Sequence, residues 1–386
     1  MPLDPDTLKQ FLEALDRFVR ERLIPNEARV ADEDAIPPAI VAEMREMGLF
    51  GMSIPQEHGG LGLTMSEEVQ AAFVLGQTSP AFRSLIGTNN GIGAQGIVMD
   101  GTPEQKARYL PALAAGEMIA SFALTEPDAG SDAGSIRCSA RRDGDDFVLN
   151  GTKRFITNAP YADVFTLFAR TDPDSRTASG VTAFLVEARS PGITLGPPDR
   201  KMGQRGAKTC DVILDDVRVP ASSIIGGPER LNQGFRTAMK VLDRGRLHIS
   251  AVCVGAAERL IREALAYATQ RRQFGEPIAE KQLIQAMLAD SRAEAYAARC
   301  MVEETARRKD AGTNVSTEAA CCKMYASEMV GRVADRAVQI HGGSGYMADF
   351  AVERFYRDVR LFRIYEGTTQ IQQIVIARNM IREAAA

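Results

Sequence analysis

The pattern of hydrophobic residues changes twice along the chain. Residues 1–120 and 226–386 carry apolar side chains at helical spacing, as in the run from Leu8 to Val19. Residues 121–225 instead hold short β-rich runs with no long amphipathic helix between them. Such strands favour an antiparallel sheet or barrel over a βαβ nucleotide-binding fold. The sequence therefore predicts an α+β multidomain protein with an N-terminal α-helical domain (1–120), a middle antiparallel β-sheet domain (121–225) and a C-terminal domain like a four-helix bundle (226–386).

Local signals mark the ends of several elements. Thr102 is followed by Pro103 and, three positions on, by Gln105, which predicts a capping box and a helix start. Thr64 and Glu67 have the same form. The segment 142–145 (RDGD) predicts a β-hairpin turn, and the glycine pair 342–343 predicts the end of a helix.

Composition and charge exclude several classes of protein. The 46 Lys and Arg residues against 50 Asp and Glu give a net charge of −4, so we expect no nucleic-acid partner. The six cysteines form no CxxC pair and the three histidines are far apart, so we expect no metal site. We interpret the cysteines as reduced thiols of a cytoplasmic protein. The N-terminus lacks an apolar leader, and the longest nearly apolar run, Ile249–Ala257, is too short to span a bilayer, so no membrane insertion is expected.

Two segments match known motifs only in part, and we expect neither to have the function of its motif. Residues 91–96 (GIGAQG) fit GxGxxG, but no β-rich run precedes them, so we interpret these small residues as helix-packing positions. Residues 342–346 (GGSGY) lack the last glycine of a nucleophile elbow, and His341 is expected to be a partly buried residue at a helix end.

Two segments combine groups that can do chemistry. The first, 125–132 (TEPDAGSD), offers hydroxyls and backbone amides that can hold the polar edge of a cofactor, although it could also be a turn between domains. The second contains Glu366 between Tyr365 and Gly367. A carboxylate among apolar groups is poorly solvated and can act as a general base, although a loop glutamate can also be simply solvated.

Taken together, six segments resemble the acyl-CoA dehydrogenase family of flavoproteins, in order and over essentially the whole chain. The resemblance implies that family's helical, β and helical-bundle domains, catabolism of fatty acids or amino acids, an FAD cofactor, electron-transferring flavoprotein as the electron acceptor, and a homotetramer. The six segments are PQEHGGLGL (55–63), FALTEPDAGSD (122–132), FITN (155–158), RRQFG (271–275), QIHGGSGY (339–346) and IYEGTTQIQ (364–372).

The resemblance also implies a role for Glu366. This glutamate would remove the α-proton of an acyl-CoA thioester while the β-hydrogen leaves as hydride to flavin N5, which gives a trans-2-enoyl-CoA. The backbone N–H of Glu366 and a flavin ribityl hydroxyl would hydrogen-bond the thioester carbonyl and stabilise the enolate-like charge. Some members place the base on the helix near Gly245 instead, but glycine cannot serve, so Glu366 is the predicted base.

The resemblance further implies which residues contact the cofactor and the substrate. The FAD would be lined by Phe122, Leu124, Thr125, Ser131, Phe155 and Thr157. It would be touched across a subunit boundary by Arg271, Phe274, Gln282, Gln339 and Gly343, and on its adenosine side by Thr368 and Gln370. The CoA portion of the thioester would be held by Ser131, Asp243, Arg246 and Gly367.

Two further residues bear on the substrate and the flavin. Arg83, followed by Ser84, resembles the glutaryl-CoA dehydrogenase branch, in which an arginine pairs with the distal carboxylate of the substrate. It could instead be an exposed or locally paired arginine at a helix end. Phe155 stands where many members carry Trp, and the chain has no Trp. Besides a general acyl-CoA dehydrogenase, the alternatives are a dicarboxylyl-CoA dehydrogenase, an O2-using oxidase or monooxygenase of the same fold, and a scaffold that only holds FAD.

Overall fold

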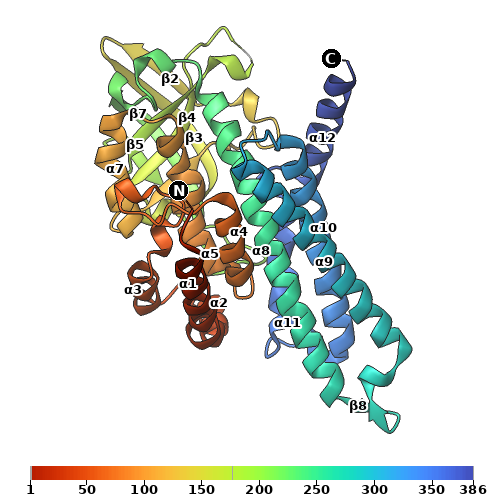
Figure 1. Ribbon diagram of the computed structural model, residues 1–386. Coiled ribbons are helices and arrows are strands. Elements are labelled where there is room, and N and C mark those ends of the chain that lie inside the picture. The colour runs from red at the N-terminus through yellow and green to blue at the C-terminus, as the bar shows by residue number, and fades with distance from the viewer. Residues whose placement is uncertain (1, 176, 386) are drawn as a thin grey trace.

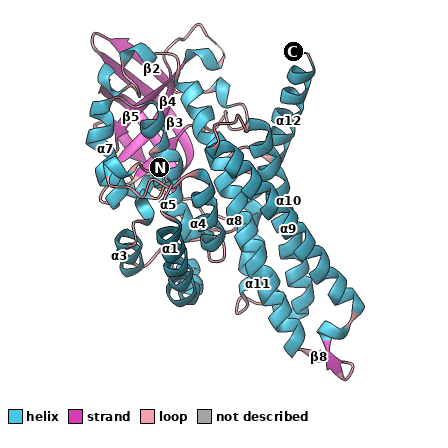
Figure 2. Ribbon diagram, in the orientation of Figure 1, coloured by secondary structure: helices cyan, strands magenta, loops and turns pink. Residues whose placement is uncertain are grey.

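The computed structural model describes residues 2–175 and 177–385. Figure 1 shows three parts: short N-terminal helices, a twisted sheet beside them, and a bundle of long helices that extends away from both. The predicted order of helical, β and helical domains is therefore confirmed. Colouring by secondary structure makes the same division, with nearly all strands gathered on one side of the molecule (Figure 2).

The N-terminal helices begin at the predicted caps. The side chain of Thr102 accepts from the backbone N–H of Gln105, whose side chain accepts from the N–H of Thr102. Thr64 and Glu67 form the same reciprocal pair. Both predicted capping boxes are confirmed. The helices of this part are α1 (Pro5–Phe18), α2 (Glu27–Glu33), α3 (Pro38–Glu46), α4 (Met65–Leu75), α5 (Pro80–Gly87), α6 (Gln95–Asp100) and α7 (Pro103–Ala115).

The GxGxxG match lies in helical structure, as predicted. It covers the end of a π-helical turn, Thr88–Gly93, and the start of α6, and helix α5 rather than a strand precedes it. A methyl group on Gly93 would lie 2.7 Å from Cβ of Ala120. Glycine here permits close packing against β1, and the segment lacks the strand that a dinucleotide-binding fingerprint requires before it.

The middle part is a seven-stranded sheet in the order β1-β4-β2-β3-β7-β6, with β5 added on β4. The predicted hairpin is confirmed, because β2 and β3 pair up to Asp143 and Asp146. One detail of the prediction is wrong: the sheet is mixed, since β1 pairs with β4 in parallel. The hairpin lies between these two strands in sequence and gives the chain the length to return in the same direction. The strands are β1 (Ala120–Ala123), β2 (Ser139–Asp143), β3 (Asp146–Thr157), β4 (Val164–Arg170), β5 (Val181–Glu187), β6 (Ile193–Leu195) and β7 (Thr209–Pro220).

The C-terminal part is a helical bundle whose apolar core is formed mainly by residues between 247 and 362. The predicted face of Val330, Val333, Ala337 and Ile340 is buried, and Gly342 ends its helix with φ +57°. A small hairpin of β8 (Arg272–Gln273) and β9 (Glu276–Pro277) forms the tip furthest from the sheet (Figure 1). The helices are α8 (Gly234–Gln270), α9 (Gln282–Asp310), α10 (Ser316–His341), α11 (Ala351–Val359) and α12 (Thr369–Ala384).

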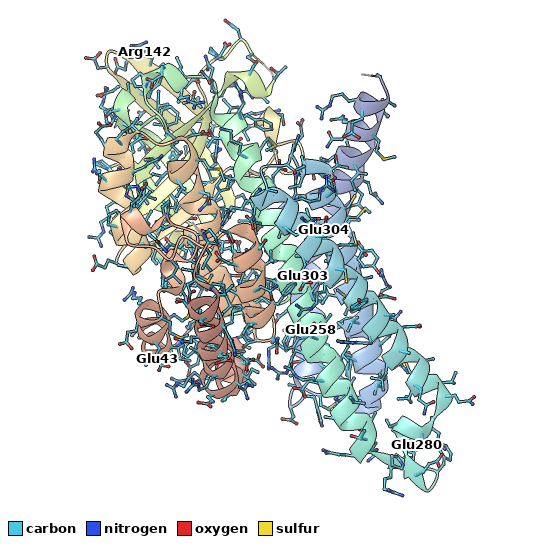
Figure 3. All side chains as sticks on the ribbon, in the orientation of Figure 1. Glu43, Arg142, Glu258, Glu280, Glu303 and Glu304 are labelled. Carbon is cyan, nitrogen blue, oxygen red and sulfur yellow. The ribbon has the colours of Figure 1, made fainter. Side chains whose placement is uncertain are left out.

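Charged side chains lie on the outside of each part: Figure 3 labels Glu43 on the N-terminal helices, Arg142 on the sheet and Glu280 on the bundle. On the bundle, Arg299 of α9 lies 2.8 Å from Glu258 of α8 and 3.1 Å from Glu303 of its own helix. None of the six cysteines, which all lie in the described ranges, is paired in a disulfide. Within residues 2–175 and 177–385, no helix combines the length and the apolar character that a bilayer crossing requires.

Helix α8 joins the three parts. Its first turns, including Ala238, pack in one cluster with strands of the sheet and with α6 and α7. Further along, residues such as Val252 and Ala256 pack with α4 and with the bundle helices. The junction of the three parts therefore lies against the N-terminal half of α8, and a cavity lined by all three parts opens there.

Candidate active site

A cavity of about 650 Å³ lies where the three domains meet. Its wall combines residues of the N-terminal helices, the sheet, α8 and the loop before α12. Ten of the residues predicted for the site line it: Arg83, Phe122, Leu124, Thr125, Ser131, Phe155, Thr157, Arg246, Glu366 and Gly367.

Glu366 lies on the loop that leads into α12. Its backbone is in the left-handed region, with φ +53°, and that of Gly367 follows with φ +90°. The carboxylate is almost fully buried, and its Oε2 atom has no hydrogen-bond partner among the described residues. A methyl group on Gly245 would lie 2.3 Å from this atom, so the carboxylate occupies the space that the glycine of α8 leaves open. A buried carboxylate with a free oxygen is suited to take a proton from a bound molecule.

Arg83 faces the same cavity from α5. Its side chain is 6% exposed, and Nη2 lies 3.8 Å from Oε1 of Glu366. Arg83 lies over Gly87, where a methyl group would be 2.7 Å from its Nε atom. That Nε atom is buried without a partner within the described chain. Arg83 is thus neither an exposed arginine nor fully satisfied, and its guanidinium retains the capacity to bind an anion.

The loop from Thr125 to Asp132 is held by a buried ion pair. Lys153 of β3 donates to a carboxylate oxygen of Glu126 at 2.7 Å and to the carbonyl of Leu124 at 3.2 Å. Glu126 also accepts from the backbone N–H groups of Arg137 and Cys138. The cation and the two amides give the buried Glu126 carboxylate three donors, which tie the start of the loop to β3 and to the segment just before β2.

Phe155 departs from regular strand geometry. It lies at an irregularity of β3 with φ +57°, and 59% of its side chain is exposed although it is large and apolar. Arg154 places its guanidinium 4.8 Å from the ring centroid. A largely exposed aromatic ring in a cavity wall, held in a strained backbone conformation, indicates a surface on which another ring can stack.

Arg246 and Asp243 form an ion pair on one turn of α8. Arg246 is buried and lines the cavity, whereas Asp243 is not among the lining residues. Burial raises the pKa of Asp243, and the Arg246 guanidinium opposes that shift. The Nε atom of Arg246 is another buried donor without a partner in the described residues.

Several predicted cofactor contacts do not line this cavity. The hairpin that carries Arg271 and Phe274 lies at the far tip of the bundle, where Phe274 is 93% exposed (Figure 1). Thr368 instead caps α12 by accepting from the N–H of Ile371. The predicted residues outside the cavity wall are Asp243, Arg271, Phe274, Gln282, Gln339, Gly343, Thr368 and Gln370.

Sequence reasoning missed two polar residues behind Glu366. Lys323 of α10 is fully buried and donates to the carbonyl of Gly367 at 2.6 Å. Gln372 of α12, also fully buried, donates to the carbonyls of Glu366 at 3.2 Å and Gly367 at 3.0 Å. A signal existed for the first: Lys323 interrupts the apolar face of a helix, a position where lysine is rare unless it has a partner.

A second buried group of charges lies between α4 and α8. Glu68 binds Arg244 and lies 2.7 Å from Nδ1 of His248. Burial alone would favour the neutral acid, but Arg244 and His248 hold the pKa of Glu68 at about 2. Burial and the charge of Arg83 lower the pKa of His248. We therefore assign a neutral imidazole that donates its Nδ1–H to the Glu68 carboxylate.

Comparison with known proteins places this arrangement in a family. The N-terminal, middle and C-terminal domain models of the acyl-CoA dehydrogenases match residues 5–117, 121–217 and 232–381. The chain belongs to the acyl-CoA dehydrogenase family. It is an oxidoreductase, as predicted, and acts on acyl-CoA thioesters.

Three proteins illustrate the similarity. The caffeyl-CoA reductase-Etf complex subunit CarC of Acetobacterium woodii is 39% identical over 92% of each chain. Butyryl-CoA dehydrogenase of Megasphaera elsdenii superimposes with a TM-score of 0.93 at 33% identity, over 99% of this chain and 100% of that one. The glutaryl-coenzyme A dehydrogenase in its glutaryl-CoA complex does so with 0.91 at 32% identity, over 99% and 96%.

As an acyl-CoA dehydrogenase, the chain uses FAD as its cofactor. The cavity wall fits that group. The hydroxyls of Thr125, Ser131 and Thr157 suit the polar edge of a flavin, and the uncovered ring of Phe155 suits its flat face. A methyl group on Gly130 would meet nothing within 4 Å, so the backbone of the loop is open to the cavity there.

Proposed function

We propose that this acyl-CoA dehydrogenase oxidises an acyl-CoA thioester to the trans-2-enoyl-CoA, with Glu366 as the base that removes the α-proton. FAD, when bound, supplies the acceptor for the hydride that leaves the β-carbon. The observation that carries the proposal is the buried carboxylate of Glu366, which has one oxygen without a partner in the described residues. It lines the same cavity as the loop from Thr125 to Asp132, which we call the flavin loop.

The residues of this chain divide the remaining work. The backbone N–H of Glu366 would bind the thioester carbonyl and stabilise the negative charge that develops as the α-proton leaves. Arg246, buried at the cavity wall with a free Nε–H, would hold the CoA portion together with Asp243. Closure of the apolar wall around the acyl chain would exclude water from the reacting carbons.

The test is anaerobic reduction of the flavin in the purified, FAD-loaded protein by butyryl-CoA, glutaryl-CoA and 3-arylpropionyl-CoA. We expect at least one thioester to bleach the flavin absorbance. Glu366→Gln should retain FAD and lower the rate constant of bleaching by about 10²- to 10⁴-fold. Absence of bleaching by every thioester, or full activity of Glu366→Gln, contradicts the proposal. Peroxide release during aerobic turnover would instead favour the oxidase or monooxygenase alternative.

Arg83 supports a second candidate, a substrate whose acyl chain ends in a carboxylate. Its guanidinium is buried in the cavity wall with a free Nε–H, and its contact with Glu366, at 3.8 Å, is longer than a hydrogen bond. The Glu366 carboxylate offsets part of the charge but leaves the Nε–H of Arg83 without an acceptor, and a distal carboxylate would supply one. The similarity to the glutaryl-CoA dehydrogenase complex supports the same class of substrate.

The partners are also part of the proposal. We infer that electron-transferring flavoprotein accepts the electrons, which is supported by the relative named as a subunit of a reductase-Etf complex. We further infer a homotetramer in the cytoplasm. Arg271 and Phe274 lie at the bundle tip, outside the cavity of their own chain, so they could reach FAD only in a neighbouring subunit. Light scattering of Phe274→Asp should show a smaller assembly than the parent, and an unchanged mass would contradict this interface.

A further inference from the structure

The loop that carries Glu366 is held from behind by α10. Lys323 donates to the carbonyl of Gly367, and Glu328, one turn further along α10, accepts from the hydroxyl of Thr369 at 2.7 Å. Glu328 also lies 3.3 Å from Nε of Arg363, at the other end of the loop. One helix therefore contacts the loop before, at and after the glutamate.

The middle of this loop adopts a turn that needs external support. Glu366 and Gly367 are both in the left-handed region, which is unfavourable for a glutamate. Lys323 and Gln372, neither of which lines the cavity, donate to the carbonyls of this turn. A methyl group on Gly367 would lie 2.4 Å from Nε2 of Gln372, so the amide is packed directly against the turn.

Lys323 is a charged residue in a fully buried position, where lysine is rare. It is fully buried between α8 and the loop, and the only hydrogen bond of its ammonium group within the described residues is the one to Gly367. Burial lowers the pKa of Lys323 to about 8, so the ammonium form still prevails at neutral pH. Burial of a cation for a single hydrogen bond is an expensive way to stabilise a fold, which indicates a role beyond packing.

We propose that Lys323, together with Gln372, is a positioning residue for the reaction: it fixes the Glu366–Gly367 turn so that the carboxylate of Glu366 stays against Gly245 and faces the cavity. This inference rests on the proposed role of Glu366 as the base. Without the two donors the turn relaxes from the left-handed region, and the carboxylate moves relative to the substrate carbon. A shift of about 1 Å in a reacting group can cost about 100-fold in rate.

The experiment compares Lys323→Met, Gln372→Met and the double variant with the FAD-loaded parent. Lys323→Met keeps an unbranched side chain, one heavy atom shorter than lysine, and removes the N–H donors. The measurements are the rate constant of flavin reduction at saturating butyryl-CoA, the Kd of that thioester, and deuterium uptake of the peptide spanning residues 364–369. Each single variant should react about 10- to 100-fold more slowly, with Kd within about threefold of the parent and faster deuterium uptake in that peptide. The double variant should lose less than the product of the two single losses, because both donors hold one turn.

Ser327→Ala is the matched control. Ser327 is a fully buried polar residue on the same helix, and its hydroxyl donates to the carbonyl of Met324 rather than to the loop. The control should keep the parental rate constant. A comparable loss in Ser327→Ala, or faster uptake throughout α8 and α10, would assign Lys323 a merely structural role and overturn the inference.

The remaining outcomes separate this inference from the proposed function. If Glu366→Gln is inactive while Lys323→Met reacts within about twofold of the parent, only the positioning role fails. If Glu366→Gln is fully active, the proposed function fails. Deuterium uptake of the peptide 364–369 in Lys323→Met and Gln372→Met then still tests whether these residues fix the Glu366–Gly367 turn. If Lys323→Met does not fold, Gln372→Met decides: a parental rate constant and parental uptake overturn the inference.

Discussion

The carboxylate of Glu366, on the loop before α12, packs directly against Gly245 of helix α8. A methyl group at Gly245 would lie 2.3 Å from Oε2 of Glu366 and 3.2 Å from its Cδ. The glycine therefore determines where the proposed base can lie, although the two residues are separated by more than a hundred positions in sequence. A side chain at position 245 and the carboxylate of Glu366 therefore exclude each other from the same space.

Gly245→Ala should therefore separate activity from stability. The methyl group meets the end of a flexible side chain, which can rotate away, and alanine favours a helix over glycine by about 0.5–1 kcal/mol. We expect unchanged thermal stability and FAD content, with flavin reduction by acyl-CoA slowed by about 100-fold because the base is displaced. Stopped-flow reduction and a thermal melt of the same sample provide the check.

Gly255→Ala is the matched control on the same helix. There the methyl group would lie 2.2 Å from the backbone carbonyl oxygen of Phe73, which cannot rotate away. This variant should lose stability and keep its rate constant per folded molecule. The opposite pattern in the two variants would disprove the assigned contact between Gly245 and Glu366.

Arg83→Leu should change the choice of substrate more than the overall rate. If Arg83 holds a distal carboxylate, kcat/KM for glutaryl-CoA should fall about 10- to 100-fold relative to kcat/KM for butyryl-CoA. The ratio is the relevant quantity, because loss of the cation near Glu366 affects both substrates alike. Arg83→Lys keeps the charge and should retain part of the preference. An equal fall in kcat/KM for the two thioesters would contradict the proposal that Arg83 binds a distal carboxylate.

Lys153→Met should weaken the flavin loop. The carboxylate of Glu126 would remain buried without its cation, and loss of one partner of a buried ion pair costs about 3–5 kcal/mol. We expect lower stability in urea and lower FAD occupancy, since the loop lines the cavity. Combining it with Glu126→Gln removes the stranded charge, so the double variant should be more stable than Lys153→Met alone. A double variant as unstable as the single one would show that the charge is not the cause.

Acid should destabilise the protein through His248 and Glu68. The pKa of His248 is lowered in the folded protein from its ordinary value of 6.5. As the pH falls below 6.5, the imidazole therefore becomes protonated in the unfolded chain before it does in the folded chain. The free energy of unfolding should thus begin to fall below about pH 6.5. The pKa of Glu68, about 2, lies below its ordinary 4.5, so its contribution is present above pH 4.5 and is lost as the pH falls toward 2.

The His248 contribution can be isolated with His248→Gln, whose amide does not titrate. Urea unfolding at pH 8, 7, 6 and 5, with FAD held at one saturating concentration, should give a parent whose stability falls more steeply with acid than that of the variant. Parallel curves over this range would mean that His248 has the same pKa in both states. Asp358 works in the other direction, because burial raises its pKa to about 6, and it is common to both proteins.

Much of the fold was predictable because its signals are local. The capping boxes at Thr64 and Thr102 and the hairpin turn at 142–145 depend on residues only three apart, and all three formed as predicted. The parallel pairing of β1 with β4 was not predictable in this way. It joins residues more than forty positions apart, and an isolated strand carries no mark of the direction of its neighbour.

The sequence by itself determined the family and its three domains, the candidate base Glu366 and the flavin loop, because these follow from short motifs and from the spacing of apolar residues. Only the tertiary structure decided that Arg83 faces the cavity, that Gly245 makes room for the carboxylate, and that Lys323 holds the turn behind it. Each of these is a contact between segments distant in sequence. The space around a side chain and the partners that compensate its burial exist only once those segments pack together.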